Sequence, residues 1–423
     1  MSDYKKILLE ELILALGCTE PIAIALTAAH AGELAGEQPE SIDVYASGSV
    51  IKNANSVYVP NSGGLQGVHI SAALGALIAK PELQLRVLEK ATDEIRQQAK
   101  KLIDEKKVVL HPAKDVDNLY IRVDIKTKNH LASAVISKAH TRLTKKELDG
   151  KTLFLLEETD EQAEEHGERL TDLHSILHYA NTVSFEENPD LKALMEQQID
   201  TNMAIARQGL EGEWGQQVGR TLMELAGGNL EREAIAMAAA GSDARMSGCD
   251  MPVTINSGSG NQGMTTSNPV IYYGQKTNVA HEKLLRAMIL ANLVALYQKQ
   301  FIGKLSAFCG AVSAGAAAGS GIAYLKGHDE TVIANTITNT LAVSGGIVCD
   351  GAKGSCALKI ATSLQNAVVG LHMAERGQVF QPGDGIVGNN VDETIRNIGR
   401  IAAEGMVSTD HTILNIMTHQ ANA

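Results

Sequence analysis

The sequence predicts an α+β protein: a mainly helical domain joined to a smaller inserted α+β domain that contains an antiparallel sheet. Three observations predict this fold class. Residues 119–126 alternate between apolar and polar side chains, which is typical of a half-solvated antiparallel strand. From about residue 161 onward the spacing of apolar residues is helical. Aromatic residues make up only 4% of the chain, so the core is aliphatic and suits closely packed helices.

The first hundred residues predict a helix, a strand and a second helical stretch. Apolar residues at helical spacing predict a helix over residues 4–16 that ends near Gly17. Residues 42–50 then alternate as in a strand. The stretch 81–106 is charged and amphipathic, which predicts one helix or a helix pair.

The strand at 119–126 is expected to have partners further along the chain. Residues 132–138 and 153–156 have the composition of strands and are predicted to pair with it. Its apolar face is formed by every second residue, namely Leu119, Ile121, Val123 and Ile125.

Helices are predicted for most of the remaining chain, at 281–302, 330–344 and 356–374. Residues 308–323 are rich in Gly, Ala and Ser, so we expect a buried helix that is too short and too weakly hydrophobic to span a membrane. One more helical face is defined by regularly spaced apolar residues: Leu191, Leu194, Met195, Ile199 and Met203.

The spacing of apolar residues changes from strand-like to helical near residue 161, and this change gives the expected domain boundaries. Residues 41–160 form the small α+β domain, and the acidic stretch 157–168 marks its end. Residues 1–40 and 161–423 together form the mainly helical domain. The chain has no fixed-period repeat and no low-complexity linker.

Charge and hydrophobicity argue against nucleic acid and membrane as partners. The net charge is −12 and no run of Lys or Arg is long enough to follow a phosphate backbone, so nucleic acid is not expected as a partner. The N-terminal residues lack a signal-peptide cleavage site, and no segment predicts a membrane span. We therefore expect a cytoplasmic protein in a reducing compartment.

The cysteines are the main chemical signal. Three of the five lie in one C-terminal stretch, at Cys309, Cys349 and Cys356. Clustered thiols beside glycine and acidic residues in a cytosolic protein favour a metal or catalysis over disulfides. Three thiolates are one fewer than a closed four-cysteine cluster site requires. Spacing alone also allows small buried structural cysteines, because no Cys-x-x-Cys is present.

The other two cysteines differ in context. Cys18 lies at the end of the predicted N-terminal helix, next to Thr19, Glu20 and Pro21. A helix that begins at Pro21 would lower the pKa of this thiol and make a thiolate available for proton transfer or ligation. An inert capping cysteine is the alternative. Cys249 is expected to be structural.

Two glycine-rich loops are candidate binding sites. Residues 256–263 contain G-x-G-x-x-G, but the segment before them reads as helix and the one after does not begin a helix promptly, which argues against a dinucleotide site. A polar loop suits a small carboxylate better, with Ser257, Gly258, Ser259 and Asn261 as binding residues. The loop at 60–67, with Asn61 and Ser62, has a similar composition. Either loop could instead be a plain turn.

The sequence contains only weak signals for pyridoxal phosphate and for zinc. Lys353 raises the question of a pyridoxal phosphate Schiff base, although a lysine between two nearby cysteines is an unusual host for that cofactor. The 13 histidines show no zinc-binding spacing.

Five blocks in order resemble the iron–sulfur-dependent L-cysteine desulfidases, relatives of the α-chain of bacterial iron–sulfur L-serine dehydratases. The resemblance covers nearly the whole chain. The blocks are Gly17-Cys-Thr-Glu-Pro21, Val59-Pro-Asn-Ser-Gly-Gly-Leu-Gln-Gly67, Asn256-Ser-Gly-Ser-Gly-Asn-Gln-Gly263, Cys309-Gly-Ala and Gly346-Ile-Val-Cys-Asp-Gly-Ala-Lys-Gly-Ser-Cys-Ala-Leu-Lys359.

The resemblance implies a [4Fe–4S] cluster held by Cys309, Cys349 and Cys356, with the substrate approaching the fourth iron. Cys18 would be the catalytic base or an alternative ligand. The implied reaction is β-elimination of L-cysteine to pyruvate, ammonia and hydrogen sulfide, with the substrate carboxylate in the 257–261 loop and help from Asn61 and Ser62. Residues 161–423 would be the cluster-binding catalytic domain.

The sequence departs from the serine dehydratases at two points, which affects substrate choice. Their Ser-Ser-Ser-His-Thr type motif is absent here, and their last two cysteines lie further apart. An iron–sulfur L-serine or L-threonine dehydratase and a non-catalytic iron–sulfur redox sensor remain the alternatives. The expected partners are a small amino-acid substrate and a second copy of the chain in a homodimer.

Overall fold

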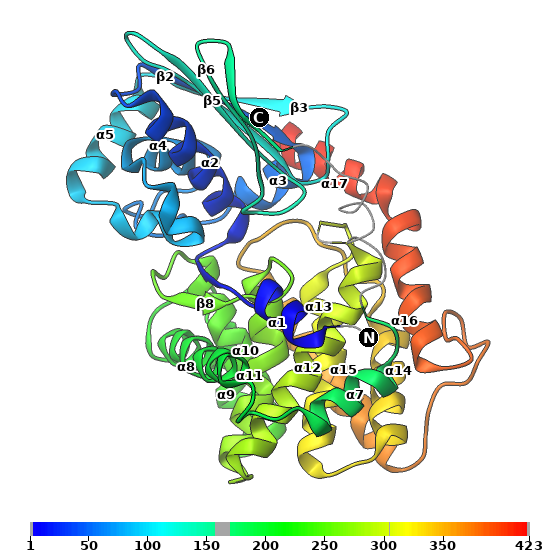
Figure 1. Ribbon diagram of the computed structural model, residues 1–423. Helices are drawn as coiled ribbons and strands as arrows, with labels where there is room; N and C mark the ends of the chain where they lie inside the picture. Colours follow the sequence, from blue (N-terminus) through cyan, green and yellow to red (C-terminus); the bar gives the residue numbers. More distant parts are fainter. Residues whose placement is uncertain (1–2, 157–169, 304, 421–423) are drawn as a thin grey trace.

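The computed structural model describes residues 3–156, 170–303 and 305–420. It has two regions, which Figure 1 shows one above the other: a sheet with helices against it, and a larger assembly of helices. This is the mainly helical α+β architecture that the sequence predicts. The acidic stretch 157–168 lies outside the described residues.

The large sheet has six strands in the order β3-β2-β4-β5-β6-β7. Strands β2 and β3 are parallel and every other neighbouring pair is antiparallel. The alternation around residue 121 is confirmed, because Ile121, Val123 and Ile125 are fully buried. The bounds are β2 Ser41–Ser47, β3 Val108–Ala113, β4 Tyr120–Lys126, β5 Leu131–Ser137, β6 Leu143–Leu148 and β7 Lys151–Leu155.

The pairing of the later strands is only partly as predicted. Strand β5 pairs with β4, but β7 pairs with β6 rather than with β4. Strand β6 was missed because its sequence, Leu-Thr-Lys-Lys-Glu-Leu, does not alternate and its residues are only half-buried. Strand β3 was also missed; it contains Pro112 and lies at the edge of the sheet, where a missing N–H is tolerated.

Five helical segments accompany the sheet: α2 Thr19–Ala35, α3 Gly48–Ala54, α4 Val68–Ile78, the 3₁₀ helix η1 Pro81–Lys90, and α5 Asp93–Asp104. The expected helix pair at 81–106 is confirmed as η1 and α5. Helix α2 is apolar on all sides and packs against α4, β4 and β5. The close approach of α2 and α4 depends on Gly75, where a Cβ would collide with the carbonyl of Ala25.

The N-terminal segment corrects one prediction. Helix α1 spans Tyr4–Glu11 only, and Leu14–Leu16 is strand β1 instead of the end of a helix. β1 pairs antiparallel with β8, Pro252–Thr254, in a two-stranded ladder. The backbone hydrogen bonds of β1 are therefore supplied by a strand that is distant in sequence, for example Val253 opposite Ala15. Local periodicity cannot show such a partner. The packing also assigns α2 to the sheet region, whereas the sequence placed residues 1–40 with the helical domain.

The helical region follows the predictions closely. Helices α12 and α14 have the predicted bounds, and α15 is one residue longer than predicted. No helix among the described residues is long and apolar enough to cross a membrane. The bounds are α7 Leu173–Thr182, α8 Pro189–Glu211, α9 Val218–Ala226, α10 Leu230–Met246, α11 Gly260–Lys276, α12 His281–Ile302, α13 Gly310–Lys326, α14 Glu330–Ser344, α15 Cys356–Glu375, α16 Val391–Arg400, the π-helical turn η2 Ile401–Gly405, and α17 Val407–Gln420.

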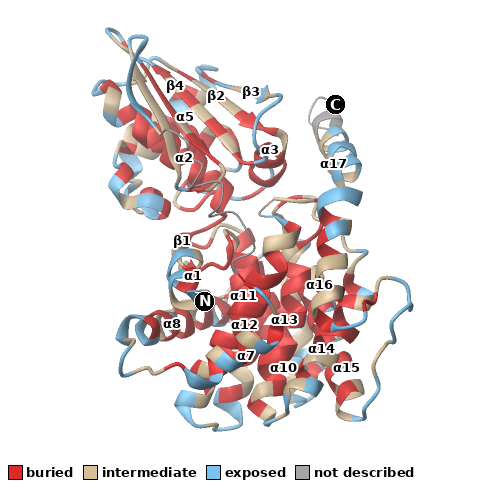
Figure 2. Cartoon of the chain, turned by 45° about the vertical axis from the view of Figure 1, so that its right-hand side comes forward, coloured by how far each residue is buried: buried red, intermediate tan, exposed pale blue. Residues whose placement is uncertain are grey.

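Each region has its own buried core, and Figure 2 shows the red, buried elements of both. Helix α17 is largely exposed and runs from the helical region to α3 of the sheet region. A third, small cluster of buried residues lies where the two regions meet, and it contains Cys18, Val57 and Met246 with Ala352 and Cys356 packed against them. We call these five residues the junction cluster.

Candidate functional site

The junction cluster brings together residues that are far apart in sequence. Cys18 precedes α2, Val57 follows α3, and Met246 ends α10. Ala352 and Cys356 belong to the loop between α14 and α15 and to the start of α15. Cys18 of the sheet region and Cys356 of the helical region therefore belong to one packed cluster, which places two of the matched sequence blocks at one site.

Three of the cysteines stand at the beginnings of helices. Cys18 is the N-cap of α2, Cys309 is the N-cap of α13, and Cys356 is the first residue of α15. The free N–H groups and dipole of a helix start favour negative charge, so thiolates or an anionic group are stabilised there. The predicted helix start at Gly310 is confirmed.

Cys309 and Cys349 lie on adjacent backbone segments. Phe308 and Val348 form an antiparallel bridge, and the Cys349 N–H donates to the carbonyl of Ala307 at 2.6 Å. A hydrogen bond between the two thiols lowers the pKa of Cys349 and raises that of Cys309. Burial raises the pKa of Cys356, which the charge of Cys349 raises further. The three thiols are thus close enough to act on one another electrostatically.

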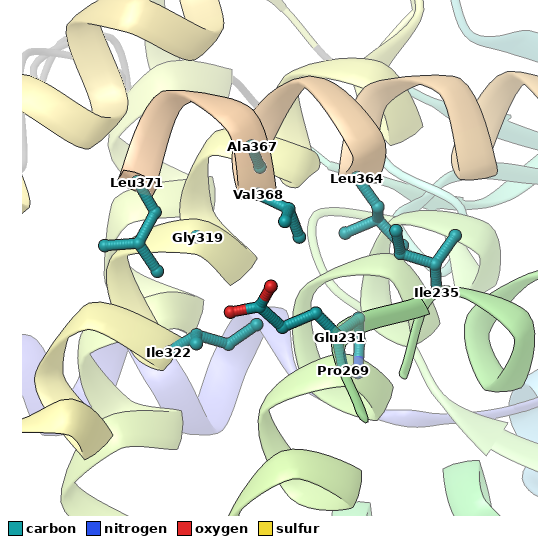
Figure 3. Close-up of a pocket in the computed structure, with 9 residues that line it drawn as sticks. All are labelled: Glu231, Ile235, Pro269, Gly319, Ile322, Leu364, Ala367, Val368 and Leu371. Carbon is teal, nitrogen blue, oxygen red and sulfur yellow. The ribbon is translucent and has the colours of Figure 1, made fainter. Parts of the chain in front are cut away.

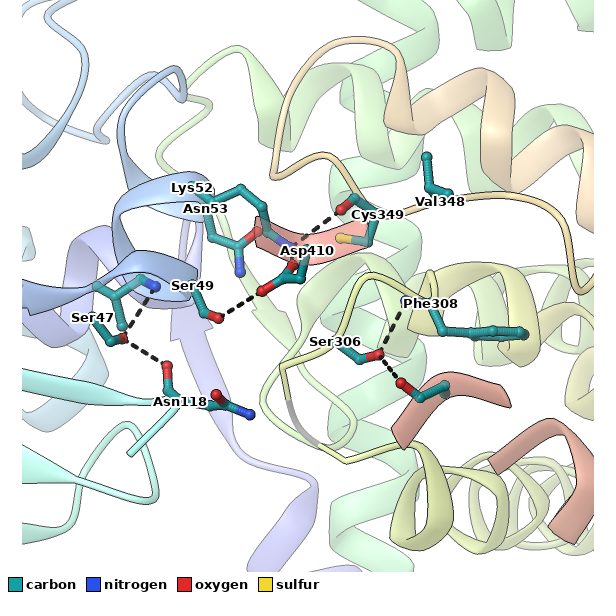
Figure 4. A network of polar contacts seen from close by, with 12 residues as sticks. Ser47, Ser49, Lys52, Asn53, Asn118, Ser306, Phe308, Val348, Cys349 and Asp410 are labelled. Carbon is teal, nitrogen blue, oxygen red and sulfur yellow. Dashed lines mark hydrogen bonds and ion pairs between the residues drawn. The ribbon is translucent and has the colours of Figure 1, made fainter. Parts of the chain in front are cut away.

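Buried cations hold the loop that carries Cys349 (Figure 4). The Lys52 ammonium of α3 donates to the Cys349 carbonyl at 3.2 Å and pairs with Asp410 of α17. Lys359 donates to the Val348 carbonyl at 3.0 Å and pairs with Asp350. Both ammonium groups lower the pKa of the Cys349 thiol. The surroundings therefore favour thiolate over thiol at this position.

These residues fit an iron–sulfur cluster better than a single metal ion. No group of three His, Cys, Asp or Glu side chains in the described part of the chain is arranged around one ion. In a cluster each thiolate binds a different iron, so the sulfurs need not converge on one point. Cys309, Cys349 and Cys356 form no disulfide, interact electrostatically and lie near helix starts and lysines. This donor set is chemically suited to hold an anionic cluster.

Cys18 has a different environment from the one predicted for it. Helix α2 does begin beside it, but the pKa of its thiol is raised rather than lowered, first by burial and then by the charge of Glu20. The thiol donates to Glu20 Oε2 at 3.3 Å. The effect of the helix start is therefore outweighed, and Cys18 is a protonated thiol bound to a carboxylate.

Glu20 is buried and still ionised. Burial works to raise its pKa, but hydrogen bonds and the nearby imidazole of His140 hold it at about 2. Its Oε1 lies 3.6 Å from His140 Nε2 and accepts from Asn53 Nδ2 at 3.3 Å. The Thr19 hydroxyl donates to Oε2. A thiol, a carboxylate and an imidazole thus form a chain of proton-carrying groups.

The glycine-rich loop 256–261 lies against this chain. The Thr19 hydroxyl lies 2.6 Å from the Gly258 carbonyl oxygen, and a Cβ on Gly258 would come within 2.8 Å of the His140 ring. Ser259 caps α11 by accepting from the Gln262 N–H, and Asn261 accepts from Arg245 at 3.3 Å. Ser257 is buried in a left-handed conformation in the same loop. All four predicted binding residues of this loop therefore lie at or just before the start of α11.

The setting of this loop corrects two local predictions. A strand, β8, precedes it and α11 begins within it at Gly260, whereas the sequence predicted helix before it and no prompt helix after it. The strand belongs to a two-stranded antiparallel ladder and not to a parallel sheet, so the arrangement is unlike a dinucleotide fold. Gly263 is required for packing, since a Cβ there would clash with the Thr254 carbonyl.

A buried polar network supports the loop from the helical side. Gln262 donates to Asn256 at 2.7 Å, and Asn256 donates to Asn292 of α12 at 3.0 Å. A Cβ on Gly310 would lie 2.7 Å from Gln262 Oε1, so the residue after Cys309 lies against this network. The network is only partly satisfied, because the buried Gln262 Oε1 has no hydrogen-bond partner. The loop and the start of α13 therefore lie against one another at this network.

The second glycine-rich loop lies beside the site, but its polar side chains are engaged locally. Asn61 donates to the Leu88 carbonyl at 3.3 Å, and the Ser62 hydroxyl closes a turn with Leu65. Pro60 packs against Gly17, where a Cβ would clash with the proline ring. The loop therefore supports the segment that carries Cys18, and the binding role of Asn61 and Ser62 stays a prediction.

The remaining features are a lysine in the cysteine loop, the fifth cysteine and a pocket. Lys353 pairs with Asp350 at 3.4 Å, and Cys249 is buried in the core of the sheet region, consistent with the structural role expected for it. A small pocket between α10, α11, α13 and α15 is lined mainly by aliphatic side chains, with the Glu231 carboxylate directed into it (Figure 3). Glu231 is bound by His372 at 2.8 Å, and none of the predicted site residues lines this pocket.

Sequence reasoning missed several residues that the fold brings to the site. Glu20 stood inside a matched block, and a lone lysine at position 52 in an apolar helix was a usable signal. His140 and Arg245 have no recognisable signal in the sequence, because their neighbours in the site come from other elements. Asp410 likewise reaches Lys52 only through the position of α17.

The fold and the site define a mainly helical α+β protein with three clustered thiols and a fourth held by a carboxylate. The chain belongs to the serine dehydratase α-chain family, whose model matches residues 82–415. It is 44% identical to a UPF0597 protein of Lachnoclostridium phytofermentans over 98% of this chain and 99% of that one. It is 42% identical to a UPF0597 protein of Finegoldia magna over 99% of both chains. A Treponema denticola UPF0597 protein is 39% identical over 98% of this chain and 97% of the other.

Proposed function

We propose that the protein is a [4Fe–4S]-dependent L-cysteine desulfidase, a carbon–sulfur lyase that converts L-cysteine to pyruvate, ammonia and hydrogen sulfide. The observation that carries the proposal is the junction of the two regions. There Cys356, one of three thiols that act on one another electrostatically, packs in the same cluster as Cys18, whose environment is different. The family supports a lyase. The sulfur specificity is our inference from the matched blocks and from the absence of the serine dehydratase motif.

Cys309, Cys349 and Cys356 would hold the cluster, and Lys52 and Lys359 would fix the loop between them. When bound, the cluster supplies a Lewis-acidic iron that makes the β-sulfur a better leaving group. The protein contributes everything else: it binds the amino acid in one orientation, excludes water from the buried junction, and moves the Cα proton.

Cys18 is our proposed base for the Cα proton. Its thiol donates to Glu20 and is protonated here, because the carboxylate has a pKa of about 2 and cannot hold that proton. Acting as a base therefore requires the bound substrate to lower the pKa of this thiol. The thiolate then takes the proton from Cα, and the electron pair of the broken C–H bond forms the new Cα–Cβ double bond as sulfide leaves. The resulting enamine hydrolyses to pyruvate and ammonia. Asn261, Ser257, Gly258 and Ser259 would position the carboxylate, with Asn61 and Ser62 nearby.

A second candidate is an iron–sulfur L-serine or L-threonine dehydratase, which the family match favours. The same residues would then serve a hydroxyl leaving group. None of the five cysteines forms a disulfide, which suits a cytoplasmic, reducing environment, and we propose this as the location.

The deciding experiment compares substrates on anaerobically reconstituted protein. Pyruvate and sulfide are measured with L-cysteine, and pyruvate with L-serine and L-threonine. The proposal predicts equal amounts of sulfide and pyruvate from L-cysteine and a much lower rate with the hydroxy amino acids. Faster turnover of L-serine would establish the dehydratase, and no turnover of any of them by cluster-loaded protein would indicate a redox sensor.

A further inference from the structure

Arg245 is a buried cation that has no acidic partner. It lies near the end of α10 and is only 2% exposed. Its Nη1 donates to Asn261 at 3.3 Å, while its buried Nε has no hydrogen-bond partner. Across the described residues it forms no ion pair. A guanidinium stays charged and has five donors, so a buried one is expected to be paired.

The guanidinium lies directly over the start of α11. A Cβ on Gly260, the first residue of that helix, would clash with Nε and come within 2.7 Å of Cζ. A glycine at this position therefore allows the arginine to approach the helix start. Helix α11 has 17 residues, and its start favours an anion. Two independent sources of positive potential thus meet at the same place.

The acidic group beside Cys18 at the junction is already engaged. Glu20 accepts hydrogen bonds from Cys18, Thr19 and Asn53 and lies beside His140. Arg245 acts electrostatically on Cys18, which locates it at the junction of the two regions. The protein therefore places a charged, incompletely bonded donor group next to the proposed base and supplies no acid of its own to neutralise it.

We propose that Arg245 binds the α-carboxylate of the amino-acid substrate, together with Asn261 and the start of α11. This rests on the proposed function and deepens it, because it assigns the ligand class as a small α-amino acid with a free carboxylate. The fork of the guanidinium matches two carboxylate oxygens, and such charge-assisted pairs are the strongest hydrogen bonds that a side chain makes.

The test measures binding of two probes by calorimetry under anaerobic conditions, on reconstituted full-length protein. L-alanine keeps the α-carboxylate and cannot undergo elimination, whereas L-alaninamide replaces the carboxylate by a neutral amide. We expect the wild type to prefer L-alanine, and Arg245→Gln to bind it about 10- to 100-fold more weakly and to lose the preference. Arg245→Lys should keep part of the preference for L-alanine over L-alaninamide. Arg86→Gln removes a guanidinium paired with Glu89 at the surface and serves as the control.

Equal binding of both probes by the wild type, or an unchanged preference in Arg245→Gln, would overturn the assignment. Iron content and the unfolding midpoint are measured for each variant. Should the Gln variant fail to fold, Arg245→Lys decides: unchanged affinity for L-alanine contradicts a bidentate contact, and weaker affinity supports it. Failure of the proposed function is a separate result, since it would appear as no pyruvate from L-cysteine while the wild type still binds L-alanine.

Discussion

The two regions of the molecule contribute differently to the site. The helical region presents three thiols from the starts of α13 and α15 and the loop before α15, on helices built largely from small residues. The sheet region has an ordinary half-solvated sheet, and it contributes Cys18, Glu20, His140 and Lys52. In the proposed function one region carries the cofactor ligands and the other carries groups that can move a proton. Neither region then contains the whole proposed site.

The family match includes the proposed cluster ligands but not the proposed base. It covers residues 82–415, which include Cys309, Cys349 and Cys356 but not Cys18. The relatives align over nearly the whole chain, so the aligned length extends into the N-terminal part, in which Cys18 lies. We infer that cluster ligation and proton transfer can be separated by mutation, and the predictions below test this separation.

The largest effect is expected from Cys18→Ala. If Cys18 is the base, turnover of L-cysteine should fall by about 10²- to 10⁴-fold. Cluster absorption should persist, because the other three thiols remain. Cys249→Ala, which removes a buried cysteine of the sheet region, is the matched control and should keep most activity. A Cys18→Ala protein as active as the control would refute the role of the sheet region in proton transfer.

Breaking the link between the regions should have the next largest effect. Lys52→Met leaves Asp410 without its cation and the Cys349 carbonyl without its donor, so we expect a loss of about 3 kcal/mol in the free energy of unfolding and a lower iron content. Chemical denaturation measures this. Lys101→Met, on the exposed side of α5, is the control. Equal stability of the two variants would show that the link is not structural.

The cysteine loop itself can be tested with two glycines. Gly351 has a φ of +94° and a Cβ there would clash with the Lys52 carbonyl, so Gly351→Ala should destabilise the protein by about 1 to 3 kcal/mol and reduce cluster loading. Gly354 is three residues away and has open space around it, so Gly354→Ala should change little. The ratio of bound iron in the two variants is the readout. Similar loading would mean that the loop is not held as described.

The smallest effect is expected far from the junction. Burial works to raise the pKa of Glu375, but Lys326, His328 and His372 together hold it at about 2. Because this pKa is below the unfolded value, the group stabilises the protein above about pH 4.5, and the contribution is lost as pH falls towards 2. Glu375→Gln should cost about 1 kcal/mol at pH 7 with normal activity. A larger activity loss than stability loss would connect this group to the site.

The fold was largely predictable where the signal is local. Strand β4 and helices α12 and α14 follow directly from the spacing of apolar residues. Strand β1 was not predictable in this way, because Leu14–Leu16 forms a strand only through its pairing with β8. Strand β6 lacks alternation because its residues are half-buried on both faces.

The site also contains some features that the local sequence predicts and others that it does not. The cysteines and the 256–263 loop stand out because glycine and cysteine occur together in short blocks. The protonated state of Cys18 depends on burial and on Glu20, and His140 and Arg245 reach the site from a turn after β5 and from the end of α10. These features depend on tertiary contacts, which spacing along the chain cannot reveal.

The central claim is that the helical region alone holds the cluster while Cys18 is left for chemistry. Bound iron and acid-labile sulfide per chain, measured after anaerobic reconstitution of Cys18→Ala and Cys356→Ser, test it most directly. We predict about four of each per chain in Cys18→Ala, as in the wild type, and a large loss in Cys356→Ser. Loss of iron from Cys18→Ala to the level of Cys356→Ser would make Cys18 a ligand and contradict the account.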